Sequence, residues 1–466
     1  MPLSARLRAT FRASVLTRPG YWNYVVAMLF GGTGFWVARI AQDWLLLKLT
    51  NSLVMVGLAQ ALQNAPLLLL GLFGGVLADR FSSRTLLLIA QSGVALSAVA
   101  LGVLTISGEV RPWHVLAAAV FVGFTQVLEQ PARAAMVPLL SGPKLPQALS
   151  LNSVAFQGSG FWGPALSAIL IATVGTGWAF IANAAGCLVT IVLITLIRQL
   201  PVPLVTGSRP TVREGITTIR RTSQIAWTMV LVGVLSLTLL NMPVIYADMA
   251  THVFHQGIDG YGQFNSLAAL GSVAGSALAG RFLAPARLRV LTISLGVIAV
   301  LMAAAALSPW PALFGAIILL AALMSVMFTL RASGLIQMST VQEARGRVMS
   351  VYIIVLLGGQ AIGGPIMGRF VDAVGGRTAL MSSALVAAVA ATILAWWMGH
   401  ASGQTQNLSQ RTQARARVIF TITPPGERTP RTRQAHLPHK ARKLGIRPVD
   451  LPVRRLRHPS IESPRG

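Results

Sequence analysis

The sequence carries little charge for its length. Asp, Glu, Lys and Arg together account for 11% of its 466 residues, whereas about 25% is usual in soluble domains. The charges lie in short groups separated by long uncharged stretches. Roughly 20 apolar residues suffice to cross the hydrocarbon core of a bilayer, and many stretches here reach that length. The composition therefore excludes an ordinary soluble protein and predicts an all-α integral membrane protein.

Cysteine and several chemical motifs are also scarce or missing. Cys187 is the single cysteine, which excludes an internal disulfide and a cysteine-rich metal site. No Gly-Lys-Ser/Thr phosphate-binding loop occurs, which argues against an ATP-driven pump. No residue pattern typical of an enzyme active site is visible either. We therefore expect neither an enzyme nor a bound metal or cofactor.

What the sequence does contain is a series of twelve apolar segments. The longest interval between them, 198–224, is rich in Pro and ends in a basic stretch. This predicts twelve transmembrane helices in two six-helix bundles (22–197 and 225–398), joined by a central loop (198–224) and flanked by a basic N-terminus (1–21) and a basic tail (399–466). The expected spans are 22–47, 53–77, 85–107, 112–132, 148–174, 177–197, 225–248, 261–282, 288–308, 312–332, 348–370 and 377–398.

The positive charges favour one orientation of these spans. Cytoplasmic loops of membrane proteins collect Lys and Arg, and alternate intervals here hold nineteen such residues against four in the others. The first apolar segment is too long for a signal-peptide core, so we expect it to be retained. We predict an inner-membrane protein with both termini in the cytoplasm. The inner group is Arg6, Arg8, Arg12, Arg18, Arg80, Arg84, Arg133, Lys144, Arg198, Arg209, Arg213, Arg220, Arg221, Arg281, Arg287, Arg289, Arg331, Arg345 and Arg347; the outer group is Lys48, Arg111, Arg369 and Arg377.

An internal repeat with an offset near 200 residues supports the two-bundle plan. Transporters built from two similar halves show such repeats. Each match is short, and the four occur in the same order in both halves. They pair Arg133-Ala134 with Arg331-Ala332, Ser150 with Ser350, Gly163-Pro164 with Gly364-Pro365, and Val174-Gly175 with Val374-Gly375.

The tail, 399–466, has no apolar span and has 14 Lys and Arg against three acids. Such a composition favours disorder. We interpret it as a solvated cytoplasmic extension. Contact with anionic lipid is the alternative, because each basic residue near such a surface contributes about 1 kcal/mol. Binding to nucleic acid is not expected.

Charged residues inside the predicted spans are candidates for function, because an unpaired charge in hydrocarbon costs several kcal/mol. Arg39 and Asp43 are four residues apart, so they share one helix face and can pair. Glu129 and Arg133 occur with Gln126 and Gln130 near the end of the fourth span. These four charged residues form the candidate proton or substrate pathway; the alternatives are a self-neutralising pair near the interface and a polar helix end. Asp248, His252 and His255 follow the seventh span, and we expect them in a solvated loop.

The run Gly74-Gly75-Val76-Leu77-Ala78-Asp79-Arg80-Phe81-Ser82-Ser83-Arg84 lies between the second and third spans. It resembles the signature loop of the major facilitator superfamily, although Ser82-Ser83 replaces a glycine and a basic residue. The resemblance implies that Gly75, Asp79, Arg80 and Arg84 belong to an inner-side charge lock that changes between transport states. Residues 129–138, 149–153 and 49–52 resemble the enterobactin-exporter and macrolide-efflux branch of that superfamily.

The second half carries a related inner-side group. Arg345-Gly346-Arg347-Val348-Met349-Ser350 resembles the corresponding loop of the same branch, and we group Arg331, Glu343, Arg345 and Arg347 as inner-side elements. Gly163-Pro164 and Gly364-Pro365 are expected to serve helix packing and bending, since small residues let helices approach closely. The fifth span also approaches the glycine-rich motif of drug–proton antiporters.

Together these patterns predict a secondary transporter that acts as a monomer in the lipid bilayer. Resemblance implies proton-coupled efflux of an amphipathic small molecule such as a drug, a macrolide-like compound or a siderophore. Two alternatives remain open at this point: a proton-coupled importer, and a non-transporting scaffold or sensor that works through its basic tail. The Arg39/Asp43 pair counts against the second alternative.

Overall fold

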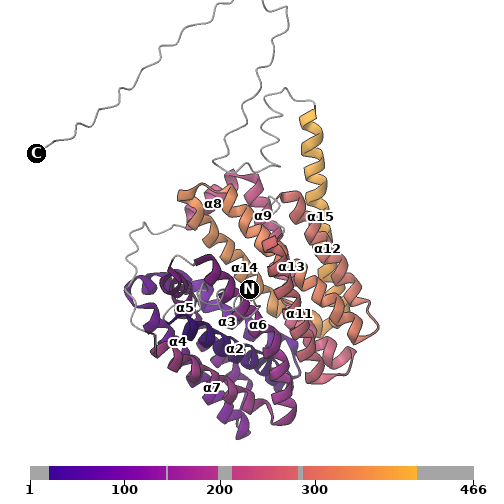
Figure 1. The fold of residues 1–466 in the computed structure, drawn as a ribbon. Helices are drawn as coiled ribbons and strands as arrows, with labels where there is room; N and C mark the ends of the chain where they lie inside the picture. Colours follow the sequence, from indigo (N-terminus) through magenta and orange to yellow (C-terminus); the bar gives the residue numbers. More distant parts are fainter. Residues whose placement is uncertain (1–19, 143–144, 198–211, 282–286, 407–466) are drawn as a thin grey trace, which may run out of the picture. The chain divides into compact units, whose positions relative to one another are not determined.

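The computed structural model describes residues 20–142, 145–197, 212–281 and 287–406, and every regular element in these ranges is a helix (Figure 1). The all-α prediction is thereby confirmed for the described residues. The first group of helices is α2 (Tyr21–Thr50), α3 (Leu53–Arg80), α4 (Ser83–Ile106), α5 (Pro112–Ser141), α6 (Leu145–Thr173) and α7 (Thr176–Thr195). The later group is α8 (Val212–Arg221), α9 (Ser223–Val234), η3 (Leu235–Leu239), α10 (Met242–Asp248), η4 (Met249–Val253), α11 (Gly257–Arg281), α12 (Leu288–Ala306), α13 (Pro311–Ser339), α14 (Gln342–Val374) and α15 (Gly376–Gln406).

Each predicted span coincides with a helix, or with the continuous series α9–η3–α10–η4, to within a few residues. Within the described residues, ten helical segments are long and apolar enough to cross a membrane. Two more helices of similar length, α6 and α11, are not among these ten. Some boundaries differ by more than that. The basic end of the central loop forms the helix α8, and α14 begins at Gln342 rather than at 348. The helices α5, α13 and α15 continue to Ser141, Ser339 and Gln406, beyond the expected ends at 132, 332 and 398.

Residues with special backbone preferences stand at the helix junctions. Gly175 and Gly375, which the internal repeat pairs, both have positive φ (98° and 81°) between consecutive helices. Glycine adopts this region without the steric penalty of a side chain. Asn51 and His255 are the positive-φ non-glycine residues of the described chain, and each follows the first long helical segment of its group. The repeat is thus visible in backbone geometry as well as in sequence.

The seventh predicted span is a broken helix. Pro243 is the second residue of α10, and a proline has no N–H to donate to the preceding turn. The chain passes through the π-helical turn η3 just before this point. Asn241 donates from its Nδ2 to the carbonyls of Ser236 (3.1 Å) and Leu237 (3.0 Å). The side-chain amide therefore satisfies carbonyl groups that the break releases, and the helix resumes instead of ending.

The most extensive contacts between the early group and the later one are those of α3 with α14 and of α6 with α11. At the α3–α14 interface, a Cβ on Gly57 would overlap the carbonyl of Gly364, so the two backbones touch. At the α6–α11 interface, a Cβ on Gly262 would lie 2.5 Å from that of Ala168. Within the groups, α2 packs on α6 and α7, and α12 packs on α13 and α15. Small residues thus determine where the early and late helices meet.

Contacts between junctions define two ends of this assembly. Arg377 donates to the carbonyl of Ser308 (2.9 Å), and Asp372 binds the start of α3, so the junctions at 51–52, 307–310 and 375 share one end. Arg84 donates to the carbonyl of Thr195 (2.6 Å) at the opposite end. We call these the arginine-poor end and the arginine-rich end, after the charge pattern of the sequence.

Candidate functional site

The most deeply buried acid of the predicted pathway is Asp43 in α2, whose side chain is 1% exposed. Its Oδ2 lies 3.6 Å from Nε of Arg39, one turn earlier, and accepts a 2.9 Å hydrogen bond from the hydroxyl of Tyr261 in α11. Nη1 of Arg39 donates to Oε1 of Gln63 in α3 (2.7 Å). The sequence predicted the Arg39–Asp43 pair. It did not reveal that helices from both groups surround it.

Glu129 and Arg133, the second predicted pair, form an ion pair of 3.3 Å within α5. They border a cavity of about 80 Å³ among α2, α4, α5 and α7. Its polar lining is completed by Gln91, Gln126, Gln130 and Asn183, and its apolar lining includes Met28, Phe35, Val94 and Val122. Oε1 of Gln91 is buried and has no hydrogen-bond partner within the described part of the chain. A ligand or water that donates a hydrogen bond would satisfy it.

A second cavity, of about 40 Å³, borders Arg39, Gln42 and Gln63. The two cavities share the lining residues Phe35, Val94, Val122 and Asn183. Arg39 of the first predicted pair and both residues of the second therefore border two cavities that share part of their lining. Across the described ranges, no group of three or more His, Cys, Asp or Glu side chains is arranged to bind a metal ion.

The predicted charge lock lies where α3 ends and α4 begins. Arg80 is exposed in the last turn of α3, and Arg84 binds the end of α7 through Thr195. Gly75 and Asp79 also belong to the last turns of α3, but their side-chain surroundings lie outside what the structure describes. Ser82, which departs from the family pattern, accepts a hydrogen bond from the backbone N–H of Thr85 (3.1 Å) and so caps α4. The departure has a structural role of its own.

The second-half inner-side residues lie on α13 and α14. Arg345, in the first turns of α14, donates to the carbonyl of Gln337 (3.1 Å), which lies near the end of α13. Arg347 is partly buried in the same helix, and Arg331 is partly buried in α13. The side chain of Glu343 is outside the described set. Arg345 therefore connects the ends of two consecutive helices.

The two predicted Gly-Pro pairs occupy close helix contacts. A Cβ on Gly163 would lie 2.6 Å from that of Trp36, so this glycine allows α6 to approach α2. Pro164 follows within α6, and Pro365 lies within α14 directly after Gly364. Gly364 faces Gly57 of α3 across the interface described above.

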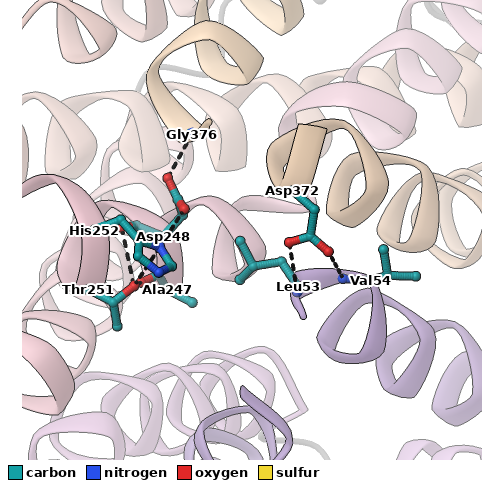
Figure 2. A network of polar contacts seen from close by, with 8 residues as sticks. All are labelled: Leu53, Val54, Ala247, Asp248, Thr251, His252, Asp372 and Gly376. Atoms are coloured by element: carbon teal, nitrogen blue, oxygen red, sulfur yellow. Dashed lines mark hydrogen bonds and ion pairs between the residues drawn. The ribbon is translucent and has the colours of Figure 1, made fainter. Parts of the chain in front are cut away.

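The prediction of a solvated loop was wrong for Asp248, whereas His252 is exposed in η4 and His255 is exposed between η4 and α11. Asp248 ends α10 and is 5% exposed, because the chain continues as the helical turn η4 rather than leaving the protein. Figure 2 shows its carboxylate accepting from the backbone N–H of Gly376 (2.7 Å), at the start of α15, while its other oxygen contacts Nδ1 of His252 (2.8 Å). The ring of His252 is half-exposed. Asp248 is thus a helix cap inside the later group.

Asp372 in α14 is a second capping acid, and the sequence interpretation missed it. Its carboxylate accepts from the backbone N–H groups of Leu53 (3.0 Å) and Val54 (3.3 Å) (Figure 2). It also accepts from the hydroxyl of Ser52 (2.9 Å). These residues start α3, more than 300 residues away in sequence. A signal was available: Gly364, Gly368 and Asp372 follow one another at intervals of four, which places them on one helix face.

Comparison with known proteins agrees with this architecture. Residues 14–418 match a family of the major facilitator superfamily described as "Transmembrane secretion effector". The staphyloferrin A transporter of Staphylococcus aureus is 30% identical over 153 residues, which is 32% of this chain and 38% of that protein. The enterobactin exporter EntS of Salmonella choleraesuis is 26% identical over 188 residues, 40% of this chain and 45% of that one. Each match therefore spans less than half of the relative.

Solved structures show the same fold over most of the chain. An inward-facing bacterial homologue of the human lysosomal transporter Spinster has a TM-score of 0.66 at 15% identity, covering 81% of this chain and 96% of that one. A D-xylose–proton symporter has a TM-score of 0.63 at 14% identity, covering 80% and 96%. The resemblance expected from the loop at 74–84 is confirmed by the family match, and the chain belongs to the transmembrane secretion effector family of major facilitator superfamily transporters, a family of multi-pass membrane proteins.

Proposed function

We propose that this transporter exports an amphipathic small molecule of the siderophore type in exchange for protons. Two six-helix halves (22–197 and 225–398) rock about the α3–α14 and α6–α11 interfaces, so that a site between them opens to each side in turn. The arginine-rich end and both termini face the cytoplasm, following the distribution of Lys and Arg between the loops.

The observation that carries proton coupling is the environment of Asp43. A carboxylate that is 1% exposed in a membrane helix is costly unless it is paired or neutralised. Here its partners come from both halves: Arg39 from α2 and Tyr261 from α11. Protonation would weaken its attraction to Arg39 and reduce its capacity to accept from Tyr261. Proton binding would therefore change a contact between the halves, which is what coupling to a rocking motion requires.

Support for the substrate class comes from the relatives and from the lining of the cavity of about 80 Å³ within the early group. That volume is below the usual size of a small-molecule site, so the cavity would form only one wall of the proposed site between the halves. Amide side chains and the Glu129–Arg133 pair supply hydrogen-bond donors and acceptors, while Phe35 and Met28 supply apolar surface. Such a lining suits a molecule with both polar and apolar faces. Two relatives are named for siderophores, staphyloferrin A and enterobactin, and this chain's own cargo is proposed by analogy with them.

The test is transport into inside-out membrane vesicles, in which export appears as accumulation. Vesicles with the wild-type protein are energised and given a panel of catecholate and hydroxycarboxylate siderophores and lipophilic drugs. We expect accumulation of at least one siderophore that is lost when an uncoupler collapses the proton gradient. Asp43→Asn should reduce accumulation to the level of vesicles without the protein. Glu109→Gln, at an exposed acid in a junction of the arginine-poor end, is the matched control and should transport normally.

Two results would overturn the proposal. Full gradient-dependent transport by Asp43→Asn would remove the proton role of this site. Accumulation only in right-side-out vesicles would reverse the direction and make the protein an importer.

A further inference from the structure

At the arginine-poor end, the acid that caps the start of α3 belongs to another helix group. The first N–H groups of an α-helix have no partner within the helix, so a nearby side chain or water must satisfy them. At α3 the carboxylate of Asp372 accepts from two of these groups, Leu53 N–H and Val54 N–H. A carboxylate is also favoured at this position by the partial positive charge of a helix N-terminus.

Close packing one turn away brings Asp372 into reach. A Cβ on Gly368 would lie 2.7 Å from Cα of Val54 and would overlap the carbonyl of Leu53. One turn further, Gly364 meets Gly57. The α3–α14 interface is therefore tight up to the point at which Asp372 caps α3. Any motion that separates the two helices at this end must first break the Asp372 contacts.

Ser52 occupies the position where a helix usually supplies its own cap. Its backbone is extended (φ −130°, ψ 123°), as N-cap residues are, and serine is among the preferred N-cap residues. Yet its side chain makes no capping bond to its own helix. Its hydroxyl donates to Oδ2 of Asp372 instead (2.9 Å). Rotation of this one side chain would let its oxygen accept from the first turn of α3 once Asp372 has moved away.

We propose that Asp372 and Ser52 form an exchangeable cap that sets how readily the arginine-poor end opens. In the closed state Asp372 caps α3 from across the interface. In the open state Ser52 caps α3 from within its own helix, so opening does not leave the N–H groups unpaired. The proposal rests on the rocking motion proposed above, and it needs no assumption about cargo or coupling ion.

The other capping acid of this end provides a matched comparison. Asp248 caps α15 in the same way, through the N–H of Gly376, but both helices belong to the later group. Its bond is therefore expected to persist when the two halves separate. Loss of the Asp248 cap should weaken the fold without favouring the open state, whereas loss of the Asp372 cap should favour the open state.

The experiment measures a distance across the arginine-poor end. Cys187→Ser removes the native cysteine, and Ser107→Cys with Leu307→Cys places one spin label at an exposed position after α4 and another after α12. Double electron–electron resonance on the full chain in lipid nanodiscs then gives the populations of short (closed) and long (open) distances. Asp372→Ala should raise the ratio of open to closed about three- to thirtyfold, the equivalent of about 0.7–2 kcal/mol at 1.4 kcal/mol per factor of ten. Asp248→Asn should lower the thermal midpoint and leave this ratio unchanged.

Exchange of the cap is tested by a double-mutant comparison. In the wild-type background, Ser52→Ala removes the open-state cap and also the closed-state bond to Asp372. In the closed state Asp372 still caps α3, whereas in the open state the first N–H groups of α3 would lose their only proposed cap. The open-to-closed ratio should therefore fall about two- to threefold, less than the usual contribution of an N-cap. In the Asp372→Ala background, Ser52 caps α3 in both states, so Ser52→Ala should not change the ratio.

Three outcomes would overturn the inference: an unchanged ratio in Asp372→Ala, an equal rise in Asp248→Asn, or the same shift from Ser52→Ala in both backgrounds. Its failure is separable from failure of the proposed function. If Asp372→Ala opens the arginine-poor end while no siderophore is exported, the cap stands and the cargo assignment falls.

Discussion

The α3–α14 and α6–α11 interfaces share their packing and differ at their ends. Both bring backbones together through glycine, at Gly57 and Gly364 in the first and at Gly262 in the second. At the first, the helix that starts at the arginine-poor end receives its capping acid from the partner helix through Asp372. At the second, α11 carries an acid of its own in the first turn, Asp259. From the cap proposed above, we expect the first interface to resist opening at this end more than the second does.

The largest effect is expected where the first interface is tightest. In Gly57→Ala the new methyl group would meet backbone atoms of Gly364 and Pro365, and neither can rotate away. Overpacking of this kind costs about 1–3 kcal/mol or more, so we expect poor yield of folded protein and a strongly lowered thermal midpoint in size-exclusion assays. Gly262→Ala should also destabilise the fold, because Cβ of Ala168, 2.5 Å away, is fixed to its own backbone and cannot rotate away. The loss should be somewhat smaller than in Gly57→Ala, since the overlap is with one methyl group rather than with the carbonyl of Gly364 and the nitrogen of Pro365.

The control for this prediction lies on the same interface. A Cβ on Gly358 of α14 would make only ordinary contacts, 3.8 Å from the tip of Leu68. Replacing a helical glycine by alanine gains up to about 1 kcal/mol of helix propensity. Gly358→Ala should therefore keep or raise the midpoint. An equal fall in the thermal midpoint of Gly57→Ala and Gly358→Ala would show that the interface tolerates no added volume at either position. The Gly57–Gly364 contact would then be no more sensitive than the rest of the interface.

Parts of this arrangement were readable from sequence because they depend on local patterns. Apolar length predicted where the long helices lie, ten of which in the described residues are long and apolar enough to cross a membrane, and a spacing of four residues predicted the Arg39–Asp43 pair. Contacts over long sequence distances were not readable, such as Tyr261 with Asp43 or Asp372 with Leu53. They depend on which helices become neighbours, and helical periodicity does not specify that. Asp248 was misplaced because the predicted span ends at this residue, whereas the π-helical turn η4 continues the helix past it and Gly376 binds its carboxylate.

A medium effect is expected for the polar contact next to the second interface. Tyr261→Phe removes the bond from α11 to Asp43 and leaves Arg39 as the described polar partner of that carboxylate. Polar pairs between membrane helices contribute about 0.6 kcal/mol on average and up to about 1.7. We expect a coupling energy in that range from a thermal double-mutant cycle of Tyr261→Phe with Asp43→Asn.

Tyr246→Phe is the control for that cycle, since its ring packs on Phe264 and Phe314 in the later group. The stability changes of Tyr246→Phe and Asp43→Asn should add in the double variant. Additivity of Tyr261→Phe with Asp43→Asn would instead mean that the hydroxyl–carboxylate bond contributes nothing to joining α2 and α11. The second interface would then depend on packing alone.

The smallest effect is expected at Asp259, and it sharpens the comparison most directly. An acid in the first turn of a helix contributes about 0.3–1 kcal/mol through the helix dipole at an exposed site, and Asp259 is exposed. Asp259→Asn should therefore lower the thermal midpoint slightly at low salt, and the difference should shrink in high salt as screening increases. Because this acid belongs to the helix that it stabilises, the open-to-closed ratio measured with the spin labels should stay at the wild-type value. A shift as large as that of Asp372→Ala would mean that any charge change at this end alters the opening equilibrium, and that the distinction between a cap from the partner helix and one from within the helix has no consequence for transport.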